Sequence, residues 1–148
     1  MPTKKRNLNV VTSVLEAYRR LLNRDASDTN TAIDEALAVV GRAAEVDRVY
    51  VFSLTDKDGT EYASQRNEWT AEGVAPQIDN PQLQDIPMAE EGYARWLDEL
   101  RADRPIVGPV TSLPADERPV LEEQGIESIL VLPIWQHGRL FGFVGFDD

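Results

Sequence analysis

The stretch that most constrains the fold is the C-terminal one, IESILVLPIWQHGRLFGFVGFDD, at residues 126–148. It contains two apolar runs, residues 128–135 and 140–146, separated by a short polar segment that holds Gly138. This pattern predicts two antiparallel strands joined by a tight turn. The second run is apolar on both faces, and a strand of that kind has to be covered on both faces. We therefore expect the second strand to lie in the middle of a sheet.

Regular alternation along this second strand would divide its side chains between the two faces of the sheet. Leu140, Val144 and Phe146 are expected on one face, with Phe141 and Phe143 on the other. Gly142 and Gly145 leave room for something to approach the backbone closely. A packed helix is the commoner cause of such glycines, and a ligand is the alternative.

Composition narrows the class of protein. The chain has 148 residues, enough for one domain with a sizeable core. It contains no cysteine, which excludes disulfides, thiolate metal sites and cysteine nucleophiles. Its single histidine, His137, falls in the predicted hairpin turn and argues against a Ser-His-Asp mechanism. The net charge of -11 disfavours nucleic acid as a partner. With no apolar run long enough for a membrane helix and no signal peptide, we expect a cytoplasmic protein without membrane insertion.

Residues 1–25 differ in character from the rest, because they hold six of the fifteen basic residues. Leu8, Val11, Leu15, Tyr18 and Leu22 recur there at alternating steps of three and four, which predicts an amphipathic helix. Its seam can pair with the same helix of a second subunit, and the candidate dimer interface is Val11, Leu15, Tyr18 and Leu22. Packing of the helix on its own domain is the alternative. We divide the chain into this helix, residues 1–25, and a domain over residues 26–148.

The periodicity of the remaining chain predicts a mixture of helices and strands. Helices are expected over residues 31–45, 90–101 and 116–124, and further strands over residues 48–54, 60–69 and 105–107. Residues 70–89 contain a glycine and three prolines without periodicity, so no regular element is expected there. Two hairpins indicate an antiparallel sheet of five or six strands. Helices on one face and a loop–helix segment on the other give an α+β fold.

From about residue 31 to its end the chain resembles a GAF domain, the small-molecule sensor module of bacterial signalling proteins. The similar stretches are RVYVF at 48–52, SQRNEW at 64–69, PQIDNPQLQDIP at 76–87, GYARWLDEL at 92–100, ERPVLEEQGIESILVLPI at 117–134 and GRLFGFVGFDD at 138–148. It looks in particular like the GAF domains of multidomain sensor histidine kinases and diguanylate cyclases. The resemblance implies a GAF/PAS-like fold built on a central antiparallel sheet.

The resemblance also implies a ligand cavity between the sheet and residues 70–112. By their position in the family pattern, the candidate walls are Tyr50, Phe52, Trp69, Tyr93, Trp96 and Phe143. Aromatic residues so placed are more often plain core than ligand contacts, and both interpretations remain. GAF domains frequently form parallel dimers through terminal helices. We therefore expect a homodimer that passes a small-molecule signal to an output kinase or cyclase domain or partner chain.

Residues that this chain lacks exclude several GAF ligands. The N-K-x-F-D-E motif of cyclic-nucleotide binders is missing, and Asp85-Ile86-Pro87 matches the phytochrome D-I-P motif without the accompanying histidine and cysteine. Haem needs an axial histidine, which His137 in its turn does not offer. We expect no bilin, haem or metal cofactor and no catalytic residue. The expected function is a non-catalytic sensor of bacterial two-component signal transduction. A ligand-free GAF fold that serves as a dimerisation or protein-interaction module is the alternative.

Overall fold

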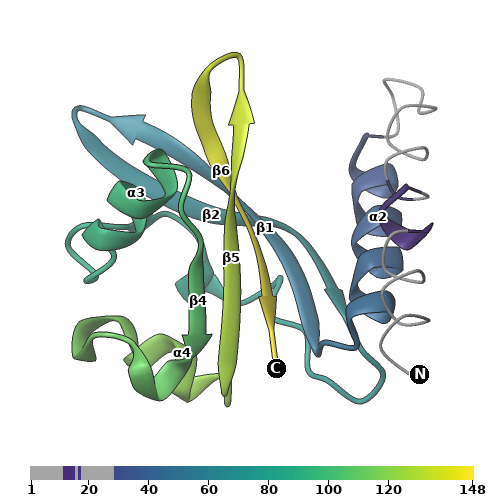
Figure 1. Ribbon diagram of the computed structural model, residues 1–148. Helices are drawn as coiled ribbons and strands as arrows, with labels where there is room; N and C mark the ends of the chain where they lie inside the picture. The colour runs from purple at the N-terminus through teal and green to yellow at the C-terminus, as the bar shows by residue number, and fades with distance from the viewer. Residues whose placement is uncertain (1–11, 16, 18–28) are drawn as a thin grey trace.

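The computed structural model of the chain describes residues 12–15, 17 and 29–148 (Figure 1). The helices are α2 (Thr29–Ala44), α3 (Ala94–Arg101) and α4 (Pro119–Glu123), with 3-10 turns η2 (Pro81–Leu83), η3 (Val110–Ser112) and η4 (Ala115–Glu117). The strands are β1 (Arg48–Lys57), β2 (Thr60–Thr70), β3 (Ile86–Pro87), β4 (Ile106–Pro109), β5 (Ser128–Gln136) and β6 (Arg139–Asp147). None of the helices in these ranges has the length and apolar character needed to cross a bilayer.

The described strands form one six-stranded sheet in the order β3-β2-β1-β6-β5-β4. Every neighbouring pair is antiparallel. The two central strands, β1 and β6, are those with apolar side chains on both faces, as burial on both faces requires. The expected α+β class, the antiparallel sheet and the central place of the last strand are therefore confirmed.

Helix α2 covers one face of the sheet, on the side opposite to α3 and α4 (Figure 1). Leu37 of this helix packs with Val49 of β1 and Trp69 of β2 in a small apolar cluster. Gly41 allows the close approach, because a Cβ atom at that position would overlap the indole ring of Trp69. The alanine-rich sequence of α2 serves the same end, since small side chains bring a helix near a sheet.

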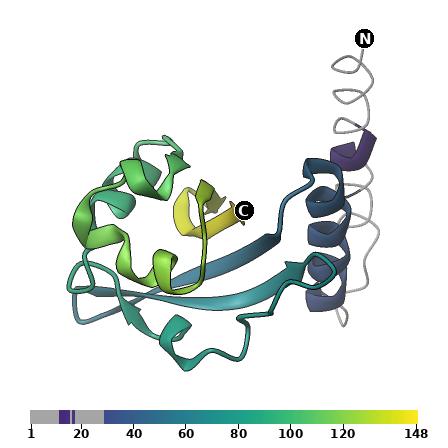
Figure 2. The same cartoon turned by 90° about the horizontal axis from the view of Figure 1, so that it is seen from below.

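The other face of the sheet carries the larger core. The chain from β3 to α4 curves round this side, as the view from below shows (Figure 2). Leu100 of α3, Ile106 of β4 and Val131 of β5 are almost completely buried there. The expected arrangement, a helix layer on one face and a loop–helix segment on the other, is the one observed.

Two elements differ from the sequence-based expectation. Residues 70–89 are not wholly irregular, since they contain η2 and the short strand β3, which pairs with Tyr62 and Ala63 of β2. The following helix begins at Ala94 instead of residue 90. Gly92 has φ +93° and lies against the backbone of Asp116, so the chain cannot become helical before that residue.

Two β-bulges change which side chains share a face. In β2, Gln65 and Asn67 pair with the adjacent residues Phe52 and Val51, so Arg66 is an extra residue. In β6, Leu140 and Gly142 pair with adjacent residues of β5, which leaves Phe141 as the extra residue. Each bulge reverses the alternation beyond it. The expectation that Leu140 shares a face with Val144 and Phe146 is therefore wrong: Leu140 packs in the core that contains Phe143.

Candidate ligand-binding site

A cavity of about 490 Å³ lies between the sheet and the chain from η2 to β5. This volume falls within the range of small-molecule sites in proteins. The sheet contributes one wall, and α3, α4 and residues 81–88 contribute the other. The apolar lining residues are Phe52, Ala63, Leu83, Ile86, Met88, Trp96, Val120, Leu121, Ile126 and Phe143.

The wall formed by the sheet is aromatic. The rings of Phe52 and Phe143, paired neighbours on β1 and β6, stack with centroids 5.0 Å apart. Tyr50 lies two residues before Phe52, and its ring crosses over Gly145 of the neighbouring strand. A Cβ at Gly145 would overlap that ring, so the glycine makes room for Tyr50 in the wall. Close packing, and not a ligand, therefore explains this glycine.

The opposite wall is held by a buried carboxylate. Glu117 of η4 is 1% exposed and accepts hydrogen bonds from both Arg95 Nε and Nη2 at 2.7 Å and from Trp96 Nε1 at 2.8 Å. These three bonds fix the indole of Trp96, which packs edge-on against Phe143 with ring centroids 6.1 Å apart. Tyr93 packs against Trp96 in turn, with centroids 5.0 Å apart. Glu117 thus positions Trp96 of α3, and through it Tyr93, the residue just before the helix.

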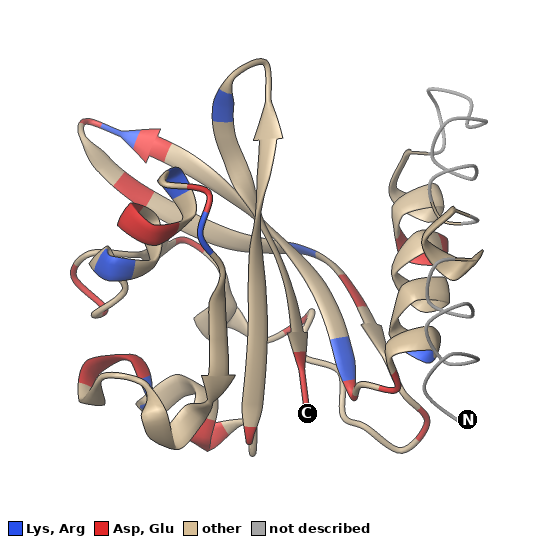
Figure 3. Cartoon of the chain, viewed as in Figure 1, with Lys and Arg blue, Asp and Glu red and all other residues tan. Residues whose placement is uncertain are grey.

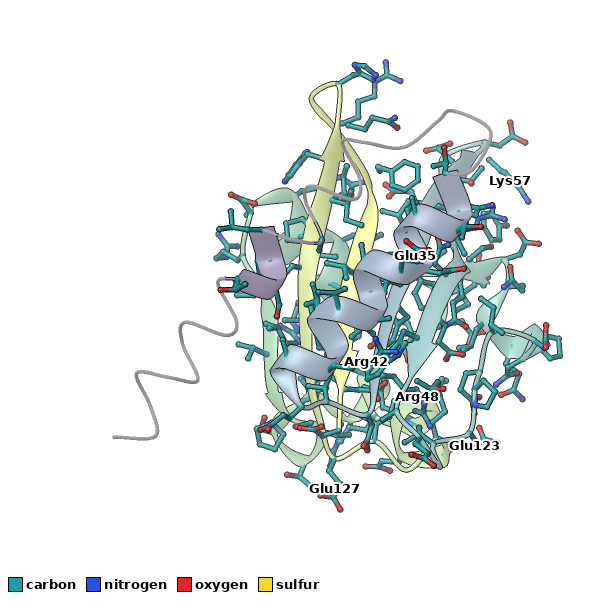
Figure 4. All side chains as sticks on the ribbon, turned by 90° about the vertical axis from the view of Figure 1, so that its right-hand side faces the viewer. Glu35, Arg42, Arg48, Lys57, Glu123 and Glu127 are labelled. Atoms are coloured by element: carbon teal, nitrogen blue, oxygen red, sulfur yellow. The ribbon has the colours of Figure 1, made fainter. Side chains whose placement is uncertain are left out.

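Four polar residues gather at one end of the cavity: Arg48, Gln65, Glu68 and Asp147. Arg48 and Asp147 are paired neighbours at the ends of β1 and β6, and Arg48 Nη1 lies 3.6 Å from Asp147 Oδ1. The Arg48 Nε group donates to the carbonyl of Ala75 at 3.3 Å. Figure 4 shows Arg48 at the same end of the molecule as Glu123, another lining residue.

Glu68 closes this end of the cavity against residues 77 and 78. Its carboxylate accepts the backbone N–H groups of Gln77 at 2.9 Å and of Ile78 at 3.1 Å. Gln65 Nε2 donates to the same carboxylate at 3.4 Å, which turns the amide oxygen of Gln65 away from it. The bonds from Gln77 and Ile78 tie the segment after β2 to the wall of the site.

Two acceptor atoms in this polar end have no hydrogen-bond partner among the described residues. They are Oε1 of Gln65 and Oδ1 of Asp147, in residues that are 4% and 2% exposed. Buried polar atoms are nearly always paired, because leaving them unpaired costs free energy. Both residues line the cavity, so a molecule inside it can supply the missing donors.

Burial also perturbs the acidities of the site. It raises the pKa of Asp147 from 3.8 to about 7; the Arg48 guanidinium lowers this pKa, while Asp47, Glu68 and Asp148 raise it. Burial, followed by the charge of Asp147, raises the pKa of Tyr50, so the phenol stays protonated. Burial, then Glu117 and Glu91, raise the pKa of Tyr93 to about 12. Asp147 is thus the group of the three that changes charge near neutral pH.

The structure brings together five of the six aromatic residues expected to form the cavity walls. Tyr50, Phe52, Tyr93, Trp96 and Phe143 all line the cavity. Trp69 does not, and its predicted place is corrected: its ring packs under α2 on the opposite face of the sheet. The cause is the bulge at Arg66, which sets Trp69 on the other face from Gln65 although their numbers differ by an even number.

Arg48, Gln65 and Asp147 were not predicted as ligand contacts. Gln65 and Glu68 belong to the similar stretch SQRNEW, and Asp147 closes the final-strand pattern. A charged residue at the end of an apolar central strand was the available signal for Asp147. No sequence signal indicated the role of Glu117, because its partners Arg95 and Trp96 are about twenty residues away in the sequence.

Little of the candidate dimer interface falls within the described residues. Val11, Tyr18 and Leu22 lie outside them, whereas Leu15 is described and is 62% exposed. Val14 beside it is 50% exposed, and Ala17 is buried. The proposed interface, and the division of the chain at residue 25, therefore stay predictions.

Comparison with known families identifies the fold, because the GAF domain model matches residues 28–148. The chain belongs to the GAF domain family.

The chain is also similar to a protein of established role. It is 41% identical over 144 residues to the methanogenesis regulatory histidine kinase FilI of Methanothrix harundinacea (strain 6Ac). The match covers 97% of this chain but only 16% of the kinase. The chain is thus related to a small part of a much longer regulatory enzyme.

Solved structures show the same fold. The chromophore-binding domain of a bacteriophytochrome from R. palustris gives a TM-score of 0.72 at 17% identity, over 93% of this chain and 51% of that one. The phycocyanobilin-bound GAF domain of a cyanobacterial phytochrome gives a TM-score of 0.69 at 17% identity, over 94% of this chain and 79% of that one. NreA of Staphylococcus aureus, mutated in its nitrate-binding site, gives a TM-score of 0.60 at 13% identity, over 84% of this chain and 88% of that one. At these identities the likeness establishes the fold alone.

Proposed function

We propose that this chain is a non-catalytic sensory domain that binds a small molecule between the sheet and residues 70–112. The observation that carries the proposal is the cavity of about 490 Å³, lined by stacked aromatic rings and by two buried acceptor atoms that receive no hydrogen bond from the described residues. A cavity with mostly apolar walls and a few convergent polar groups is the usual form of a ligand site. The relationship to a regulatory histidine kinase supports a sensory role.

Kinase activity, in this proposal, resides in another domain or in a partner chain. The ligand is held without a covalent bond, since the chain has no cysteine, and neither bilin nor haem is its ligand. In this proposal the domain is part of a two-component signalling system of the bacterial type, located in the cytoplasm. The family and the residues present support these points, which are part of the proposal.

Ligand binding changes signalling only to the extent that the ligand prefers one of two states. Residues 70–101 are the element that we expect to respond, because they contribute Gln77, Met88, Tyr93 and Trp96 to the cavity. A ligand that contacts Trp96 bears on α3 directly. We propose that the change then passes through paired N-terminal helices of a homodimer, for which the exposed Leu15 is a candidate contact.

Native mass spectrometry of gently purified protein tests the proposal. We expect a dimer that carries a reproducible extra mass. Trp96→Ala should lose that mass, because the ring forms part of the wall. Trp135→Ala, an exposed tryptophan that does not line the cavity, should retain it and is the matched control. Circular dichroism establishes whether each variant is folded. If Trp96→Ala does not fold, Ala63→Leu, which fills the cavity from the sheet side, replaces it.

The outcomes separate the two candidate functions. A dimer without extra mass, in protein that also binds no added small molecule, would favour the dimerisation or interaction module. Leu15→Asp should convert the dimer to a monomer if residues 8–22 form the interface. A wild-type monomer would contradict the proposed relay and leave ligand binding to be judged separately.

A further inference from the structure

The polar end of the cavity presents two hydrogen-bond acceptors that are not satisfied. Oδ1 of Asp147 and Oε1 of Gln65 accept no hydrogen bond among the described residues, although Arg48 Nη1 lies 3.6 Å from Asp147 Oδ1, and both can only accept while Asp147 is ionised. One N–H group of the Gln65 amide donates to Glu68. A molecule that satisfies both oxygens must therefore bring N–H or O–H donors to them.

The charged residues that line the cavity also favour a ligand that carries donor groups and positive charge. Arg48 is the one basic residue among the described residues that line the cavity, against the acids Glu68, Asp85, Glu91, Glu123 and Asp147. Three acids act on Asp147 electrostatically: Glu68, Asp47 and Asp148. The other groups near it are one cation, Arg48 of β1, and the phenol of Tyr50. Acidic positions also outnumber basic ones at the end of the molecule where the C-terminus lies (Figure 3). The potential at this end of the site favours a cation.

The remaining lining residues indicate the chemical character of the rest of the ligand. Beyond Arg48 and Asp147 the wall continues along β1 as Tyr50 and Phe52, with Phe143 beside them and Trp96 opposite. Stacked and edge-on rings bind flat or apolar groups well. The site thus has a polar, acidic end and an aromatic body within one cavity.

We infer that the cavity, if it is the sensory site proposed above, selects an organic cation: an apolar or aromatic body with an ammonium or amidinium group that donates to Asp147 Oδ1 and Gln65 Oε1. A charge-assisted N–H···O bond to a buried carboxylate is about twice as strong as a neutral one. An anion would have Arg48 as its basic contact. That guanidinium already lies beside Asp147 and donates to the Ala75 carbonyl.

Three arylalkyl probes of nearly the same shape test this selectivity. Tryptamine carries an ammonium group, 3-propylindole is neutral, and indole-3-propionate is an anion. Their dissociation constants are measured by calorimetry at pH 7.5 with protein that has been unfolded and refolded to remove any carried ligand. We expect tryptamine to bind at least about tenfold more tightly than either of the others, as a charge-assisted bond implies.

Asp147→Asn then tests the residue, because it keeps the shape and removes the charge. The preference for tryptamine over 3-propylindole should fall to within about twofold. Asp148→Asn is the matched control: it removes an equal charge from the next residue, whose side chain is exposed, and should leave the preference intact. Circular dichroism confirms that both variants are folded. A preference that survives in Asp147→Asn would overturn the inference.

The probes also separate failure of this inference from failure of the sensory function. Equal or tighter binding of 3-propylindole or indole-3-propionate would overturn the selection of a cation and leave a small-molecule site. Binding of none of the three would count against both. Tryptamine binding that disappears in Ala63→Leu would further place the site in this cavity, whereas unchanged binding would place it elsewhere and overturn the assignment.

Discussion

Replacement of Glu117 by alanine should destabilise the fold by about 3 kcal/mol, more than any exposed acidic residue would. The carboxylate is 1% exposed and accepts three hydrogen bonds, two from Arg95 and one from the buried Nε1 of Trp96. In Glu117→Ala the Trp96 donor has no partner, which costs roughly 1–3 kcal/mol. The Arg95 side chain is 42% exposed, so its ion pair adds only about 0–1 kcal/mol after screening by solvent. Loss of one buried methylene adds about 0.8 kcal/mol.

Urea unfolding followed by far-UV circular dichroism measures this effect. For a protein of this size, about 3 kcal/mol corresponds to a midpoint lower by roughly 1–2 M. Glu117→Gln retains an oxygen for the Trp96 N–H group, so it should lose about half as much. Glu99→Gln is the matched control, because Glu99 pairs with Arg104 at the surface, and its midpoint should not change.

The result that would refute this reasoning is a Glu117→Ala midpoint within error of Glu99→Gln. Trp96 would then find another acceptor at no cost, and Glu117 could not be the residue that positions α3. A Glu117→Gln variant as unstable as Glu117→Ala would instead show that the charge matters more than the hydrogen bond to Trp96.

Two further predictions concern packing and charge. Gly41→Ala should lower the free energy of unfolding by about 1–2 kcal/mol, measured by urea unfolding, because overlap with the Trp69 ring outweighs the better helix propensity of alanine. An unchanged or higher urea midpoint would contradict the close approach of α2 to the sheet. The Asp147 carboxyl should titrate near pH 7 by carbon NMR, and Arg48→Met should raise its pKa further; a midpoint near 4 would contradict its burial. Since this pKa is raised from 3.8, Asp147 binds its proton more tightly in the folded state, and its contribution to stability falls as pH rises from about 4 to 7.

Much of the fold could be predicted from the sequence, because long apolar and periodic segments carry a strong signal. The strands of the terminal hairpin and β1 follow from apolar runs such as residues 128–135, 140–146 and 48–54, and the last two of these runs have apolar side chains on both faces. Element ends were less predictable. Helix α3 begins late because Gly92 adopts positive φ against Asp116, a contact that exists only after the chain has folded.

The two residues found on an unexpected face lie on strands that each contain a β-bulge. Alternation in a strand predicts faces correctly only until an extra residue is inserted, and neither Arg66 nor Phe141 announces a bulge by its type. Trp69 was expected in the cavity from its position in the family pattern, and it lies under α2. Leu140 was expected from alternation on the face opposite to Phe143, and it lies on the same face. The five aromatic residues found in the cavity avoid this error: Tyr50 and Phe52 lie on β1, which has no extra residue, Phe143 follows the bulge of β6, and Tyr93 and Trp96 lie at the start of α3.

The polar end of the site shows what a sequence pattern does not contain. Asp147, Gln65 and Glu68 come from two strands that are separated in the sheet by β1, and only the register brings them to one end of the cavity. A buried carboxylate with an oxygen that accepts no hydrogen bond lowers stability, and an apolar residue at the end of β6 would pack without that cost. Stability is commonly sacrificed in this way where a protein binds something. That argument, independent of any family resemblance, supports our proposal that Asp147 is a ligand contact.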